Sequence, residues 1–147
     1  MSELNRVDTT LLEVIAGMKD GKAEGAFNIR KDSGCAGRVN TENVTITTKT
    51  DKPGIDIRFV PGCKDSCHIP VIITESGLRE TVYNDFYVGE GAECLIVAGC
   101  GIHNPGCETS EHDGIHTFHI SKNAKVRYVE RHYGEGDGTG GKNMNPT

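Results

Sequence analysis

The chain has 147 residues, among them 19 glycines and six cysteines, and a formal net charge of −5 at pH 7. This length fits a single domain with a modest core, and the acidic balance argues against non-specific nucleic-acid binding, which needs a basic face. No apolar run approaches the ~20 residues that span a membrane, and the first 17 residues lack the features of a secretory signal. We therefore expect a cytoplasmic protein that binds neither nucleic acid nor membranes.

The first predicted element is a helix near the N-terminus. Apolar residues recur at roughly helical spacing over Leu4–Met18. Thr10 and Glu13 have the spacing of a capping box, and Gly17 and Gly21 can end the helix. Residues 1–24 are therefore expected to form this helix and a polar, glycine-bearing linker.

From about residue 40 the pattern indicates short β-strands. The candidate strands are rich in β-branched residues, alternate between apolar and polar positions, or form short apolar runs. They are Val44–Thr48, Ile55–Phe59, Ile69–Thr74, Val82–Val88 and Leu95–Ala98. Turn sequences rich in Pro and Gly separate the first of them. We therefore expect residues 25–147 to form one mostly β domain.

An internal similarity with an offset of 32 residues narrows the architecture. Residues 86–97 can be laid on residues 118–129, so that Phe86 falls on Phe118 and the alanine of each copy coincides. Both copies consist of a strand, a polar turn, a small alanine and a second strand. Coils of a parallel β-helix are built this way, because each coil completes its core against the next. An antiparallel sandwich with two similar hairpins is the alternative.

The densest group of possible metal ligands lies between Cys100 and His119, with two thiols, four imidazoles and three carboxylates. Thiolate and imidazole suit zinc, iron and iron–sulfur clusters. A turn at Pro105–Gly106 would bring Cys100, His103 and Cys107 together. The candidate metal ligands are Cys100, His103, Cys107 and His112. A polar loop that contains several histidines is the alternative interpretation.

Strand geometry removes two histidines from this set. If Ile115–Ile120 is a regular strand, His116 and His119 lie on opposite faces and cannot share a metal without a bulge. His116 is expected to be a hydrogen-bonded core histidine. Asp113–Gly114 is expected to form a turn between strands.

The other cysteines are expected to be free thiols, because disulfides are rare in the cytosol. Cys63 and Cys67 are expected in a surface turn, Cys94 in the core and Cys35 in a loop. The glycine-rich residues 134–142 lack the phosphate-loop pattern and are expected to form a flexible loop between strands. No nucleophile elbow is present, so no catalytic residue is predicted.

Three stretches of the chain resemble the SufB/SufD family of iron–sulfur cluster assembly proteins. The first contains Gly25–Arg30, Ser33-Gly34 and Gly37-Arg38; the second contains Thr50–Ile55, His68–Ile73 and Val82–Phe86; the third and most specific contains Val97–Asn104, Ser110–Phe118 and Tyr128–Gly136. The resemblance covers nearly the whole chain after residue 24.

The resemblance implies a right-handed parallel β-helix with helical ends. It also implies a scaffold that is not itself an enzyme, acts with a SufC-type ATPase and carries an iron–sulfur cluster transiently, without needing the cluster to fold. Because family members dimerise through their β-helices, we expect a SufB/SufD-like partner or a homo-oligomer.

Family members continue beyond the position of Thr147 with further coils, so the chain is expected to be a truncated, N-terminal portion of such a protein. The family's best-supported cluster ligands and its SufC-binding surface lie in the part beyond that position, and none of them maps onto a residue here. Two other functions stay open: a metal-dependent hydrolase or isomerase that uses the Cys100–His119 segment, and a purely structural interaction module.

Overall fold

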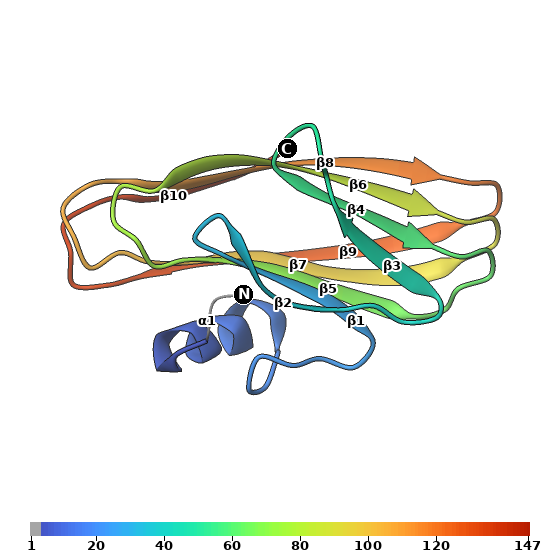
Figure 1. The fold of residues 1–147 in the computed structure, drawn as a ribbon, viewed down its shortest axis with the longest axis horizontal. Helices are drawn as coiled ribbons and strands as arrows, with labels where there is room; N and C mark the ends of the chain where they lie inside the picture. The colour runs from blue at the N-terminus through green and yellow to red at the C-terminus, as the bar shows by residue number, and fades with distance from the viewer. Residues whose placement is uncertain (1–3) are drawn as a thin grey trace.

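The computed structural model describes residues 4–147, which are mostly β (Figure 1). Residues 1–3 of the predicted N-terminal segment lie outside the described residues. The elements in chain order are α1 (Arg6–Ala16), β1 (Ala26–Lys31), β2 (Gly34–Val39), β3 (Val44–Thr48), β4 (Gly54–Phe59), β5 (Ser66–Ile73), β6 (Arg79–Val88), β7 (Glu93–His103), β8 (Ser110–Ile120), β9 (Lys125–Glu135) and β10 (Lys142–Pro146).

The strands form two mixed sheets of five strands each, ordered β2-β1-β5-β7-β9 and β10-β8-β6-β4-β3. Within residues 4–147 the β1–β2 and β3–β4 pairs are antiparallel, and all other neighbouring strands are parallel. Successive strands from β4 to β10 lie alternately in the two sheets. Each strand from β4 to β8 pairs with the strand that comes two places later in the chain. The antiparallel sandwich is therefore wrong as an interpretation of the internal similarity.

The 32-residue similarity corresponds to the register between neighbouring strands. Phe86 on β6 pairs with Phe118 on β8, 32 residues later. The turns that follow also stack, because the backbone N–H of Lys125 donates to the carbonyl of Ala92 at 2.8 Å. The prediction that residues 86–97 and 118–129 occupy equivalent places is confirmed.

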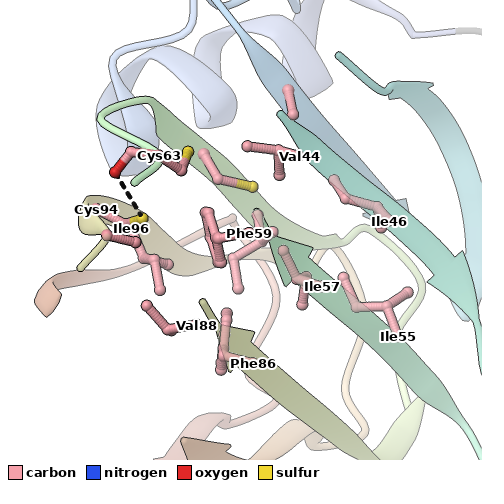
Figure 2. Close-up of a cluster of buried hydrophobic side chains, with 14 of the residues drawn as sticks. Val44, Ile46, Ile55, Ile57, Phe59, Cys63, Phe86, Val88, Cys94 and Ile96 are labelled. Carbon is pink, nitrogen blue, oxygen red and sulfur yellow. Dashed lines mark hydrogen bonds between the residues drawn. The ribbon is translucent and has the colours of Figure 1, made fainter. Parts of the chain in front are cut away.

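The main hydrophobic core lies between the sheets, near the turns that join β4 to β5 and β6 to β7. Figure 2 shows Ile57 and Phe59 of β4 within this core, beside Phe86 of the neighbouring strand β6. Phe86 is fully buried and stacks on Phe118 with 4.7 Å between ring centroids. Burial of such side chains supplies most of the driving force for closing the two sheets on each other.

Four cysteines are buried, and two predictions about cysteine positions are wrong. Cys94 is buried in the core as predicted, and its thiol lies 3.9 Å from the carbonyl oxygen of Cys63 (Figure 2). Cys63 and Cys67 are also buried in this core, where the prediction placed a surface turn. Cys35 lies on β2 instead of in a loop. The predicted surface turn is wrong because the thiols of Cys63 and Cys67 pack inward as small apolar groups.

The helix α1 covers the outer face of the sheet that contains β5 and β7 (Figure 1). Leu11 and Ile15 of the helix are fully buried there. The contact is close because Gly101 on β7 has no side chain: a Cβ at this position would lie 3.2 Å from Cδ2 of Leu11. No helix within the described residues is long and apolar enough to cross a membrane.

The helix ends as predicted and begins at Arg6, within the predicted segment Leu4–Met18. Gly17 forms the C-cap in the left-handed region, with φ 64°. The capping box joins Asn5 and Asp8, whose side chains bond each other's backbone N–H groups at 3.0 and 2.9 Å. The predicted box at Thr10 and Glu13 is wrong: the Thr10 hydroxyl instead donates to the carbonyl of Arg6 inside the helix.

Two loop predictions have different outcomes. Asp113–Gly114 does not form a turn, because both residues lie within β8 and pair with β6 and β10. Of the glycine-rich residues 134–142, residues 136–141 connect β9 and β10, whereas residues 134, 135 and 142 lie within these strands. Their backbone lies against the preceding connection, where the N–H of Gly140 donates to the carbonyl of Gly106 at 3.1 Å.

Candidate functional site

Away from the hydrophobic core, polar and charged side chains enter the space between the sheets. They stack on neighbouring strands in the same 32-residue register. Glu80 pairs with His112, Asn84 with His116, Ala98 with Glu130 and Cys100 with His132. We call Glu80, Cys100, His112, His116, Glu130 and His132 the interior polar cluster.

The Glu80 carboxylate organises one side of the interior polar cluster. It accepts hydrogen bonds from Nη2 of Arg30 at 3.0 Å and from Nδ1 of His112 at 2.8 Å. The side chains of Glu80 and His112 are only 6% and 8% exposed. Burial raises the pKa of the Glu80 carboxyl, but the bonds from His112 and Arg30 outweigh it and lower that pKa to about 2. Glu80 is therefore ionised at neutral pH.

This contact fixes the orientation of the His112 ring. Since an ionised carboxylate only accepts, Nδ1 of His112 must carry the proton, which makes Nε2 the basic nitrogen. A histidine held in this way by a carboxylate is the usual arrangement behind a metal-binding imidazole. Glu80, 32 residues earlier in the chain, therefore determines which nitrogen of the His112 ring carries the proton and how the ring is oriented.

The rings of His112 and His116 converge over a glycine. A Cβ on Gly114, which lies between them on β8, would be 3.5 Å from Nε2 of His112 and 3.1 Å from Nε2 of His116. Nδ1 of His116 lies 3.4 Å from the side-chain nitrogen of Asn84, and Nε2 lies 3.5 Å from the Glu130 carboxylate. An alanine at position 114 would fit beside His112 but would require the His116 ring to shift by a few tenths of an ångström.

Glu130 organises the opposite side of the interior polar cluster. Its carboxylate accepts a hydrogen bond from the Tyr128 hydroxyl at 2.8 Å and lies 3.1 Å from Nε2 of His132. Burial raises the pKa of this carboxyl, and the bonds from His116, Tyr128 and His132 more than offset it, lowering the pKa to about 2. Two ionised carboxylates therefore flank the imidazoles.

Cys100 lies in the same interior, only 2% exposed. Burial raises the pKa of its thiol, and the Glu80 and Glu130 carboxylates raise it further. The thiol is therefore protonated at neutral pH. A bound metal ion reverses this preference, because coordination displaces the proton from a thiol.

A cavity of about 20 Å³ lies where these side chains meet. Its lining includes Cys100, His112, His116, Glu130 and His132. This volume holds roughly one water-sized object. Within residues 4–147, however, no group of three or more His, Cys, Asp or Glu side chains is already arranged to hold a metal ion.

The four predicted metal ligands divide into two pairs. Cys100 and His112 both line the cavity. His103, at the end of β7, instead places Nδ1 3.3 Å from the carboxylate of Glu135. Cys107 is exposed in the connection between β7 and β8. The Pro105–Gly106 turn therefore does not unite the predicted ligands.

Sequence reasoning placed His116 correctly but missed most of its neighbours. His116 is a hydrogen-bonded interior histidine, with its side chain 10% exposed. Glu80, Glu130 and His132 were not singled out. The 32-residue offset would have found two of them, because it leads from His112 back to Glu80 and from Cys100 on to His132; Glu130 pairs with Ala98 and has no such signal.

Comparisons of this chain with protein-family models, with curated proteins and with solved structures found no match.

Proposed function

We propose that this chain is a scaffold component of iron–sulfur cluster assembly of the SufB/SufD type that acts with a SufC-type ATPase. The family is suggested by the resemblance of the three sequence stretches. The observation that carries the proposal is the interior polar cluster, in which the Cys100 thiol, three imidazoles and the Glu130 carboxylate line one cavity. Thiolate and imidazole are the ligands that iron and its sulfur clusters prefer.

The proposed fold is a right-handed parallel β-helix that begins with β4. The alternation of strands between the sheets, with parallel pairing to the strand two places on, supports this interpretation. In such a solenoid the side chains of successive coils stack in register. Such a fold would place Glu80 beside His112 and Cys100 beside His132 on neighbouring coils of the site.

The cluster is the cargo of this scaffold, and the chain's residues would hold it only in passing. Cys100 is the proposed sulfur ligand and loses its proton on contact with iron. His112 presents Nε2 because Glu80 holds Nδ1. Since the described residues contain no complete ligand set, the remaining ligands would come from a second copy of this chain.

The proposed partners are the SufC-type ATPase and either a SufB/SufD-like chain or a second copy of this chain. The position of β9 at the edge of its sheet supports strand pairing with a partner. The scaffold would catalyse no turnover of its own. Its proposed location is the cytoplasm, where cysteines remain reduced.

The two other functions differ in what they require. A metal-dependent hydrolase needs a preformed metal site with an open position, and no observation on residues 4–147 favours one. A purely structural module would use the sheets alone and would never bind iron. Iron binding through Cys100 would distinguish a scaffold from a purely structural module.

The test is anaerobic reconstitution of the chain with iron and sulfide, read as visible absorbance and as iron bound per chain. Cys100→Ser removes the proposed ligand, and Cys107→Ser is the matched control because it changes an exposed thiol outside the cavity. We expect the parent and Cys107→Ser to bind iron and Cys100→Ser to lose it. Equal iron in the two variants, or none in the parent, would contradict the proposal.

A further inference from the structure

A second and much larger hollow lies beside the β1–β2 hairpin and opens toward β4 and β6. Its volume is about 590 Å³, within the ~300–1,000 Å³ typical of small-molecule sites. The cationic side chains that line it are Arg30, Arg38, Lys49, Lys52 and Arg79. The carboxylate in its lining is Glu80. We call this hollow the cationic cleft.

Two of the five cations are neutralised by carboxylates. Arg30 forms its ion pair with Glu80 at 3.0 Å. Lys49 lies 2.6 Å from a carboxylate oxygen of Asp56 and 2.6 Å from one of Asp85. These pairs leave little positive charge from Arg30 and Lys49 for a ligand.

The other three cations have no carboxylate partner among the described residues. The Arg38 guanidinium donates to the side-chain oxygens of Asn28 at 2.8 Å and Thr48 at 2.9 Å, both neutral acceptors. Lys52 lies over the Tyr83 ring, 4.7 Å from its centroid. Arg79 is exposed at the start of β6 and forms no ion pair with residues 4–147.

The balance of charge at the cleft is therefore positive. Five cations stand against the three carboxylates Glu80, Asp56 and Asp85, which leaves a net charge of +2. This excess sits on a chain whose net charge is −5. Uncompensated like charges around a concave site repel one another, and this unfavourable energy is relieved when an anion binds among them.

We propose that the cationic cleft binds a small organic molecule that carries several negative charges, with its phosphate or carboxylate oxygens held by Arg38, Lys52 and Arg79. Guanidinium groups suit both kinds of oxyanion, because they donate paired hydrogen bonds in one plane. The rest of the lining suits an organic moiety, since Ile55, Ile69 and Val82 supply apolar walls. This site is distinct from the proposed cluster site, because Cys100 and His112 do not line the cleft, although Glu80 contacts both Arg30 of the cleft and His112.

Isothermal titration calorimetry of the full chain tests the proposal. Pyrophosphate represents phosphate esters, and citrate represents polycarboxylates. We expect saturable 1:1 binding of at least one of them, weakened by added salt because the attraction is between charges near the surface. Binding of pyrophosphate alone would identify a phosphate ligand, and binding of citrate alone a carboxylate ligand. No saturable binding of either would overturn the proposal.

Variants locate the binding site. Arg79→Gln and Lys52→Gln change exposed side chains, so the fold is expected to persist, as circular dichroism can verify. Each is expected to weaken binding about tenfold, the effect of losing one charge-assisted hydrogen bond. Arg131→Gln is the matched control, because Arg131 is exposed on β9 and does not line the cleft. Weakening by Arg131→Gln equal to that of the cleft variants would show non-specific attraction and would refute the site.

Discussion

Replacing Glu80 with glutamine tests the electrostatics of the site interior. Glutamine keeps the shape of the side chain and resembles its protonated form, so the change removes the charge that Arg30 and His112 contact. The pKa of Glu80 falls from 4.5 to about 2 on folding. At 1.36 kcal/mol per unit, this shift corresponds to about 3 kcal/mol of unfolding free energy. Removal of one partner from a buried ion pair typically costs a similar amount, about 3–5 kcal/mol.

The pH dependence has a definite sign. Because folding lowers the pKa of Glu80, the contribution of its carboxylate to the unfolding free energy is fully present above pH 4.5. This contribution is lost as the pH falls through about 2. Urea unfolding at a series of pH values should therefore show Glu80→Gln about 3 kcal/mol less stable than the parent at pH 7. The difference in unfolding free energy between Glu80→Gln and the parent should decrease steadily as the pH falls from 4.5 to about 2.

Glu42→Gln is the control, because Glu42 is exposed and forms no ion pair with residues 4–147. Its unfolding free energy should match that of the parent within about 0.5 kcal/mol, as for most surface substitutions. Glu80→Gln as stable as the parent at pH 7, or a difference that stays constant down to pH 2, would refute the proposed role of the carboxylate.

Three further predictions concern packing and thiols. Gly101→Val should lower the unfolding free energy by about 1–3 kcal/mol, because its side chain would collide with Leu11 and displace the helix; denaturant titration followed by circular dichroism measures this. Phe86→Ala should cost about 3–5 kcal/mol in the same assay, since it removes a fully buried ring that stacks on Phe118. In the native state one thiol, that of exposed Cys107, should react rapidly with a disulfide reagent, and Cys107→Ser should abolish this fast phase.

Several strands could be predicted because their sequence pattern is local. The β-branched residues of Val44–Thr48 match β3 residue for residue, and the alternation in Ile55–Phe59 gives β4 to within one residue. The strand Ala26–Lys31 was not predicted, although Phe27–Arg30 carries the same alternation of apolar and polar residues. Phe27 and Ile29 face the helix, while Asn28 and Arg30 line the cationic cleft.

The site was only partly predictable, because its members meet through strand register and not through sequence proximity. Cys100 and Cys107 are close in the chain but separate in the fold, whereas Glu80 and His112 are 32 residues apart and in contact. A search for nearby ligands therefore grouped residues that the fold separates. The parallel ladder brings together residues one register repeat apart, and the similarity of residues 86–97 to 118–129 already contained that repeat.

The central claim is that Cys100 is the thiol through which this chain contacts an iron–sulfur cluster. Mössbauer spectroscopy of the reconstituted chain tests it most directly, because it separates sulfur-bridged cluster iron from isolated iron ions. We predict a cluster spectrum for the parent and for Cys107→Ser, and its loss in Cys100→Ser. A cluster spectrum of undiminished intensity in Cys100→Ser would contradict the account.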